Sequence, residues 1–390
     1  MRTALTLAAI ALGVASLILS GGYVEDLLLQ LREATIHSRL GHLQIYKAGQ
    51  FASGGQRPFD YLIDDTAMID RVAAGLPGVL AQARRLSFSG LIGNGRGELP
   101  VIGEGVQPGQ EFLIGTALTM LSGRRLAEDD QYRVLVGEGL ARALKLRVGD
   151  SVNLVLTTRD GAMNTLEFDV VGVFRSLSKE YDARGVQVPL SAAAELVDTK
   201  GVSAIVVLLD RTAQTESAAA QLVMQLPAKQ FEVKTWRELA EFYNGTAALY
   251  ARQFAVLQAI ILAMVLLSVA NTVNMTLHER ISEFGVMRAL GRRSVDVFRL
   301  AILETTVMGI LGSVLGVAVG VALALVVSAI GIPMPPPPNS EAAFTASIQL
   351  VPSVIVTAFL IGVTGTVIAS VLPARKIARI PVVEALRQAT

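Results

Sequence analysis

The chain has 390 residues, of which 52% are hydrophobic and only 17% are charged, and its formal net charge is +1. Together with a mean hydropathy of +0.51, this composition argues against an ordinary soluble enzyme. The sequence contains no cysteine, which excludes a disulfide framework, a thiolate metal site, a lipidated cysteine anchor and thiol redox chemistry.

Long uncharged stretches at 3–24, 253–277, 305–340 and 342–374 alternate with charge-rich ones. A helix that crosses the hydrocarbon core of a membrane needs about 20 apolar residues. We therefore predict four transmembrane helices, at residues 1–30, 246–277, 295–329 and 350–372. The last helix is expected to stop at Pro373, because proline lacks the N–H group that would continue it.

The first stretch has a second interpretation. The basic Arg2, an apolar run and the small residues Ser20, Gly21 and Gly22 also match the pattern of a cleaved signal peptide. A retained helix is favoured, because the apolar run is long for a signal peptide and helical apolar spacing continues to residue 31.

Lysine and arginine in the short connections predict the orientation. Five arginines lie at 280–299, between spans two and three and at the start of span three, and four basic residues follow span four, whereas residues 328–349 contain none. We therefore expect a multi-pass membrane protein with both termini cytoplasmic. Residues 31–245 and the loop 330–349 then lie outside the cytoplasm, and residues 278–294 and 373–390 are cytoplasmic.

The region 31–245 is expected to fold as a large α+β domain between the first two spans, because β-branched runs alternate with Gly, Asp and Pro. Two lobes are expected, the second inserted at about 120–190, and Asp160-Gly161 marks a hairpin turn. The predicted strands are 42–46, 134–136, 151–157, 166–174, 186–189 and 203–209, and the predicted helices are 66–75, 139–146, 191–197 and 215–226.

Catalytic motifs are absent from the sequence, which has no phosphate loop, no G-x-S-x-G elbow and no H-E-x-x-H. The glycine-rich segment 93–97 lacks a following lysine and is interpreted as a turn. His37 and His42 are five residues apart, which suits neither a helical nor a strand metal pair. We expect no catalytic site, no metal and no cofactor in this chain, and no nucleic-acid partner.

The segment 277–291 has the pattern of an amphipathic helix at the membrane edge. Ile281, Phe284, Met287 and Leu290 recur every third residue on one side, and Gly291 ends the pattern. One interpretation is a surface helix that rests on lipid headgroups. The other is a helix that contacts a partner protein.

Three motifs carry a resemblance to a known family. Residues 279–291 resemble the E-R-x-x-E-I-G-x-L-R-A-x-G signature of the FtsX/MacB/LolC-type ABC transporter permeases, the mechanotransmission class. Residues 373–387 are similar to the C-terminal P-A-x-x-A-x-x-x-P-x-x-A-L-R of that family, and residues 136–150 resemble the core of its external domain. The order of one span, a large outer domain and three spans agrees with it.

The resemblance implies a dimer of permease chains, homomeric or heteromeric, each docked on a separate cytoplasmic ABC ATPase that holds the ATP and Mg. It implies that the helix between spans two and three enters a groove of the ATPase, with Phe284 and Met287 inside and the charged residues at the rim. The expected coupling residues are Glu279, Arg280, Glu283, Phe284, Gly285, Met287 and Arg288.

Within the family, residues 41–46 look most like the lipoprotein-releasing permeases. One kind of those permeases recruits a soluble carrier through a long, proline-bearing hook, but the equivalent connection here, 158–165, is short and has no proline. We expect extraction or export of a lipidated or amphiphilic substrate, with a periplasmic carrier or adaptor as an open question. The alternative is a cell-division-type transmitter that activates a periplasmic hydrolase.

Two further sets of residues in the spans are candidates. Gly312, Gly316 and Gly320 are four apart and are expected to mark a close helix contact. An apolar cleft open to membrane lipid could hold an acyl chain, or its residues could be ordinary packing residues. The cleft is expected from Leu17, Leu19, Tyr23, Leu27, Tyr250, Phe254, Leu257 and Ile261.

Overall fold

The computed structural model describes residues 2–53, 58–176, 178–334 and 344–381, and it divides into two compact units that we describe separately. The helical unit holds Met1–Leu29, Thr246–Met334 and the chain from Phe344 onward. The α+β domain is Gln30–Gly245. Parts of the predicted loop 330–349 and of the predicted tail 373–390 lie outside the described residues.

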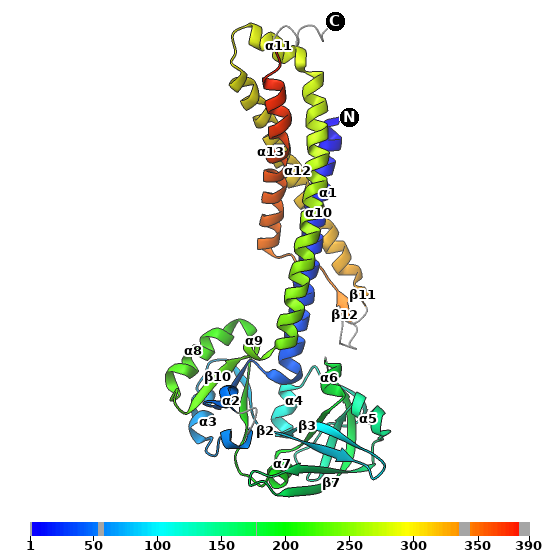
Figure 1. Cartoon of the computed structure of the whole chain (residues 1–390), viewed down its shortest axis with the longest axis vertical. Helices are drawn as coiled ribbons and strands as arrows, with labels where there is room; N and C mark the ends of the chain where they lie inside the picture. Colours follow the sequence, from blue (N-terminus) through cyan, green and yellow to red (C-terminus); the bar gives the residue numbers. More distant parts are fainter. Residues whose placement is uncertain (1, 54–57, 177, 335–343, 382–390) are drawn as a thin grey trace. The chain divides into compact units, whose positions relative to one another are not determined.

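The helical unit is built from α1 (Arg2–Thr35), α10 (Glu241–Glu279), α12 (Ser294–Ile330) and α13 (Pro352–Ala378), with the short α11 (Ile281–Ala289) between α10 and α12 (Figure 1). Within the described residues, these four long helices are apolar enough to cross a membrane, as the sequence predicted. A two-stranded hairpin, β11 (Ile332–Met334) with β12 (Phe344–Ala346), joins α12 to α13.

Helix α1 is the most buried of the four. Half of its apolar window is buried inside the unit, against 11% for α10. Its side chains Ile10, Val14 and Ile18 lie in the core beside Val265 and Val269 of α10. The helical unit is therefore organised around α1.

The prediction that the last span stops at Pro373 was wrong. Helix α13 contains Pro373 and continues to Ala378. Proline removes one backbone hydrogen bond but its fixed φ is compatible with a helix. The turn that follows is held by packing, because Ala374 and Ala378 are both buried.

The α+β domain contains one ten-stranded sheet in the order β10-β1-β9-β2-β3-β8-β5-β7-β4, with β6 pairing both β2 and β7. Its strands are β1 (Leu43–Lys47), β2 (Val79–Gly93), β3 (Glu98–Val106), β4 (Thr119–Gly123), β5 (Arg133–Gly137), β6 (Ser151–Thr157), β7 (Met163–Arg175), β8 (Gly185–Pro189), β9 (Ala204–Leu209) and β10 (Phe231–Thr235). Its helices are α2 (Gln50–Ser53), α3 (Ala67–Ala74), α4 (Pro108–Ile114), α5 (Glu138–Leu144), α6 (Lys179–Asp182), α7 (Leu190–Val197), α8 (Thr215–Gln225) and α9 (Trp236–Leu239). Short turns of other helix types are η1 (Ile36–Leu40), η2 (Pro58–Tyr61) and η3 (Thr212–Gln214).

Because β6 bridges β2 and β7, the strands β2, β3, β8, β5, β7 and β6 form a closed ring. The ring encloses a core that includes Phe88, Val101, Val136 and Phe168. A second core lies where β1 and β9 pack against α3 and α8, and includes Ile45, Ile69 and Leu222. The ring begins with β2 and β3, earlier than residue 120.

Most predicted elements lie where the sequence placed them, within a few residues. The hairpin β6–β7 turns through Gly161, whose φ is +87°. The long hairpin β2–β3, the strands β4 and β10, and the helix α4 were not predicted. Adjacent arginines, Arg84 and Arg85, interrupt the apolar alternation of β2, so its sequence did not read as a strand.

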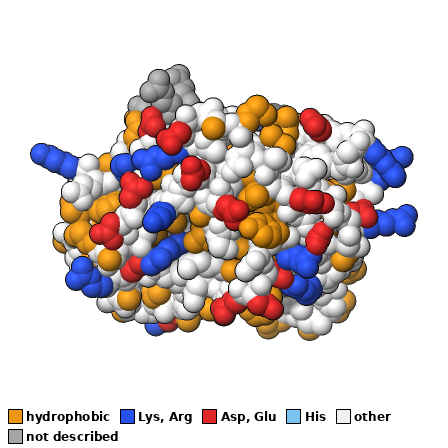
Figure 2. Space-filling view, turned by 90° about the horizontal axis from the view of Figure 1, so that it is seen from below, with side chains coloured by type: hydrophobic (Ala, Val, Ile, Leu, Met, Phe, Trp, Pro, Cys, Tyr) orange, Lys and Arg blue, Asp and Glu red, His pale blue; other side chains and the backbone are white. Residues whose placement is uncertain are grey.

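Each outer edge of the sheet carries a feature that discourages further strand pairing. The edge strand β4 has a register shift between Met120 and Ser122 where it pairs with β7. The edge strand β10 carries Glu232 and Lys234. Figure 2 shows one face of the molecule on which acidic and basic side chains are interspersed with apolar ones.

Candidate functional site

The helix α11 is braced to its neighbours by two arginines. The guanidinium of Arg280 donates to Glu283 at 2.8 Å and to both carboxylate oxygens of Glu304 on α12 at 2.8 and 2.9 Å. It also lies 5.5 Å from the ring centroid of Phe284. Arg288 donates to the backbone oxygen of Ile380, which follows α13. These contacts hold α11 in a fixed position against α12 and the end of α13.

The expectation that Phe284 and Met287 enter an ATPase groove does not agree with this structure. Phe284 is only 3% exposed and belongs to the core of the helical unit, together with Val297 and Ala374. Gly285 is also buried, and Met287 is half-buried against the same core. Of the apolar residues that recur every third position, Ile281, Phe284 and Met287 face the bundle, whereas Leu290, which follows α11, does not.

The opposite side of α11 is exposed. Val286 is 48% and Leu290 81% exposed, and the side chain of Glu283 is 55% exposed. Glu279, before the helix, is exposed as well, and so are Arg292 and Arg293 after it. Val286 and Leu290 therefore form an apolar patch with charged neighbours that a partner can reach. The helical spacing had placed Leu290 on the inner side of the helix and had not singled out Val286.

The three glycines of α12 lie against α1. A Cβ atom added to Gly312 would lie 2.9 Å from Ile10, and one added to Gly316 would lie 2.8 Å from the backbone oxygen of Ala11. A Cβ on Gly320 would approach Ala15 and Ile18 at 3.1–3.3 Å. The absence of side chains at these positions lets the two helix backbones approach closely.

The eight candidate cleft residues do not share one surface. Leu17 and Leu27 are buried, whereas Leu257 is half exposed. Leu19, Tyr23, Tyr250, Phe254 and Ile261 are intermediate. Phe254 and Ile261 lie beside Gly21 and Gly13 of α1, so α10 closes against α1 at these residues.

A buried carboxylate that sequence reasoning missed joins α1 to the segment before α13. Asp26 is 3% exposed and accepts hydrogen bonds from the backbone N–H and hydroxyl of Ser347, at 3.0 and 2.6 Å, and from the amide of Gln349 at 3.2 Å. The backbone oxygen of Gly22 accepts from the N–H of Gln349 at 3.1 Å. The Asp26 clasp therefore fixes the segment 347–349 to α1. The adjacent acids Glu25 and Asp26, just after an apolar stretch, were the available signal.

The α+β domain contains a charge cluster in which the buried Arg85, Glu104 and Glu111 are joined by the partly exposed Arg39. Arg39 donates to Glu104 at 2.7 Å, and Arg85 forms two hydrogen bonds to Glu111 at 3.1 and 2.6 Å. A further Arg85 nitrogen donates to the backbone oxygen of Arg39 in η1. Burial opposes ionisation of Glu104, but Arg39 and Arg85 outweigh it and lower the pKa of its carboxyl group. The cluster ties η1 to β2, β3 and α4.

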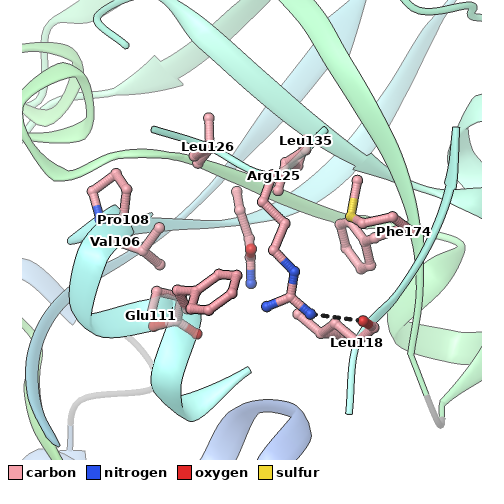
Figure 3. Close-up of a pocket in the computed structure, with 11 residues that line it drawn as sticks. Val106, Pro108, Glu111, Leu118, Arg125, Leu126, Leu135 and Phe174 are labelled. Atoms are coloured by element: carbon pink, nitrogen blue, oxygen red, sulfur yellow. Dashed lines mark hydrogen bonds between the residues drawn. The ribbon is translucent and has the colours of Figure 1, made fainter. Parts of the chain in front are cut away.

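Beside this cluster lies a mainly apolar pocket, which Figure 3 shows with Val106, Leu126, Leu135 and Phe174 in its wall. The guanidinium of Arg125 reaches into it, donates to the backbone oxygen of Leu118 at 2.9 Å and lies 5.3 Å from the ring centroid of Phe112. The hollow measures about 390 Å³ together with the open solvent at its mouth, and the space that solvent can enter holds about one water molecule.

His37 and His42, for which the sequence predicted no metal binding, lie close together, with ring centroids 6.0 Å apart. The Nδ1 atom of His42 accepts the backbone N–H of Leu209 at 3.0 Å, and its Nε2 atom lies 3.1 Å from the Thr212 hydroxyl. Burial lowers the pKa of His42 to about 4. Among the described residues, the histidines, aspartates and glutamates form no group of three that could hold a metal ion.

Four apolar helices and a large mixed domain define a multi-pass membrane protein of the permease class. The family model of the MacB-like periplasmic core domain matches residues 3–224, and that of the FtsX-like permease C-terminal region matches residues 255–382. The chain therefore belongs to the FtsX/MacB/LolC-type ABC transporter permeases, as the motifs predicted.

Three relatives illustrate the similarity. An uncharacterized ABC transporter permease of Methanocaldococcus jannaschii is 24% identical over 68% of this chain and 64% of its own length. The lipoprotein-releasing system transmembrane protein LolC of Xylella fastidiosa is 25% identical over 82% of this chain and 79% of its own. The macrolide export ATP-binding/permease protein MacB 1 of Yersinia pestis is 26% identical over 99% of this chain but only 58% of its own length.

Proposed function

We propose that this chain is the permease subunit of an ABC transporter that couples ATP hydrolysis by a separate cytoplasmic ATPase to the extraction or export of a lipidated or amphiphilic substrate. The names of the LolC and MacB relatives, which refer to lipoprotein release and macrolide export, support a hydrophobic or amphiphilic cargo. The chain itself contributes no catalytic site or cofactor in this proposal, and ATP and Mg belong to the ATPase.

The orientation in the proposal follows the positive charges. The α+β domain, inserted between α1 and α10, lies in the periplasm, and α11 and both termini lie in the cytoplasm of a cell with an inner membrane. Cysteines placed at Asn94 and Ser294 of this cysteine-free chain test it. An impermeant maleimide added to intact cells should label the first and not the second, and labelling at residue 294 would reverse the topology.

The observation that carries the coupling role is the braced helix α11. It lies between two spans, Arg280 and Arg288 fix it to α12 and to the segment after α13, and it leaves Val286 and Leu290 exposed. Exposed apolar residues with charged neighbours are typical of a protein docking surface. Because α11 is held rigidly, a displacement applied to this surface is passed to α12 and α13.

The docking surface is tested by Leu290→Glu, with Leu80→Glu in the α+β domain as the matched control, because both leucines are more than half exposed. In nanodiscs, Leu290→Glu should lose co-purification of the ATPase and ATP hydrolysis, and Leu80→Glu should retain both. Retention of both by Leu290→Glu would remove the docking role and leave a helix that rests on lipid headgroups.

A second permease chain is part of the proposal. The apolar surface of α10 is the least buried of the four spans, with Val256, Ile260, Met264 and Leu267 all more than half exposed. Either lipid or a second chain must cover such a surface. Disulfide cross-linking in membranes between two copies that carry Met264→Cys tests whether a second chain covers α10. If no cysteine in a series along α10 forms such a cross-link, this face of the helix contacts lipid.

A further inference from the structure

We propose that the end of the helical unit that carries α11 binds the headgroups of anionic phospholipids. The binding surface, which we call the basic rim, consists of Arg299 on α12 and of Arg375 and Lys376 on α13. This inference goes beyond the proposed function, because it names a membrane lipid as a partner rather than as a cargo. It requires only that the apolar helices cross a membrane.

The packing of α12 against α13 joins two parts of the chain that are distant in sequence (Figure 1). A Cβ atom added to Gly309 would lie 3.1 Å from Thr366, and one added to Gly362 would touch Ser313. The contact therefore moves four residues forward along α12 as it moves four residues backward along α13. The two helices are antiparallel, and these contacts fix which of their residues lie at the same level.

The same register extends toward α11 and sets the level of the basic rim. Ala301 and Ala374 are both buried in the core of the helical unit and agree with this register. Two residues beyond them, Arg299 comes level with Lys376, and Arg375 lies next to the latter. All three cations are exposed. The basic rim is therefore a band of three exposed cations at nearly one depth along the helices.

The charges of the basic rim are not neutralised by the protein. Among the described residues, its three cations form neither an ion pair nor a side-chain hydrogen bond. Two acids of this end, Glu283 and Glu304, both pair with Arg280. The segments 279–304 and 373–381 together hold eight basic and four acidic residues. This end of the helical unit therefore carries excess positive charge that an anion can neutralise.

Exposed leucines beside the cations favour a lipid over a soluble anion. Leu303 is 63% exposed and lies one helical turn from Arg299, and Leu372 is 76% exposed and lies one turn from Lys376. Both helices are apolar enough to cross a membrane, where these leucines would contact acyl chains. A cation one turn farther along then reaches the headgroups and keeps its aliphatic stem on the apolar surface. There its N–H groups can bind the phosphate of an anionic lipid.

The experiment measures lipid binding to the full chain in detergent micelles by native mass spectrometry. The two probes are dioleoyl phosphatidylglycerol, which is anionic, and dioleoyl phosphatidylcholine, which has no net charge. We expect the parent chain to bind the anionic lipid at least about tenfold more tightly. Arg299→Gln and Lys376→Gln should each lower that affinity about fivefold, and the double variant should lose most of the preference.

The matched control is Arg96→Gln/Arg147→Gln in the α+β domain. Both arginines are exposed and, among the described residues, form no ion pair, so the double control makes the same change of charge. The control should keep the full preference for the anionic lipid. Far-UV circular dichroism checks that every variant keeps its helices.

Equal binding of the two lipids by the parent, or full preference in the variant changed at both Arg299 and Lys376, would overturn the proposal. An equal loss in the control would also overturn it, because net charge alone would then explain the binding. Displacement of the lipid by inorganic phosphate would assign the rim to a soluble anion, and displacement by polyglutamate would assign it to an acidic protein. No ATPase is present, so the result is independent of docking at Leu290.

Discussion

The ion pair between Arg85 and Glu111 gives a quantitative test of how the α+β domain is held together. Both side chains are nearly buried, with 4% and 8% exposed, and two hydrogen bonds join them. Removing one partner of such a pair leaves an uncompensated buried charge, which costs about 3–5 kcal/mol. Arg85→Met should therefore lower the free energy of unfolding of the domain by that amount.

Replacing both partners should cost much less. In Arg85→Met/Glu111→Leu no charge is left unpaired, because Arg39 still pairs with Glu104. Apolar replacement of a whole buried pair is often neutral or stabilising. We expect the double variant to lie within about 1–2 kcal/mol of the parent, so with about 3–5 kcal/mol for each single variant the coupling energy between the two positions is at least about 4 kcal/mol.

The chain carries its own reporter for this measurement. Trp236 is the one tryptophan of the sequence, is 4% exposed, and packs in a cluster with Ala81 and Ala83 of β2, close in sequence to Arg85. Urea unfolding in detergent, followed by its fluorescence, gives the free energy for the parent, both single variants and the double variant. If the single and double variants are equally destabilised within about 0.5 kcal/mol, the argument from an unpaired charge is wrong.

Three further predictions concern other parts of the chain. Phe284→Ala should destabilise the helical unit by about 3–5 kcal/mol through the cavity it leaves, and Phe284→Leu by much less, as measured by thermal unfolding in detergent; equal stability of both variants would contradict the buried position. Gly316→Ala should weaken the α1–α12 contact and lower the temperature of aggregation, whereas Gly245→Ala, where a Cβ meets nothing within 4 Å, should not. Folding lowers the pKa of His42 from 6.5 to about 4, so the unfolded chain binds the proton more readily than the folded one. The folded state should therefore lose up to about 3 kcal/mol of stability as the pH falls from about 6.5 to about 4. A His42→Asn variant with the same pH dependence of urea unfolding would refute this.

The order of the fold could be predicted from the sequence because its strongest signals are local. An uncharged run of twenty or more residues has few alternatives to a membrane span, and the positions of the four spans follow from it. The hairpin β2–β3 could not be predicted in this way. Arg85 is charged and yet buried, since its partner Glu111 comes from a different element, and that pairing is invisible along the chain.

The candidate sites show the same limit. The spacing of Phe284 and Met287 correctly indicates an apolar face, but the pattern does not say whether a partner or the chain's own bundle covers it, and here the bundle does. Arg125 and Gln187 line one pocket only because the fold brings β8 and the segment after β4 together. The Asp26 clasp likewise joins residues from opposite ends of the sequence.

The two modified edges of the sheet restrict how copies of this protein can meet. Membrane proteins are confined to a plane, so their outer domains collide far more often than freely dissolved domains would. An open strand edge would then pair with a strand edge of a neighbouring copy through backbone hydrogen bonds and form an assembly that separates slowly. The register shift in β4 and the charged residues Glu232 and Lys234 of β10 oppose such strand pairing. If two copies of the chain meet, contact between their α+β domains is left to side chains, which break and re-form more readily than paired strands.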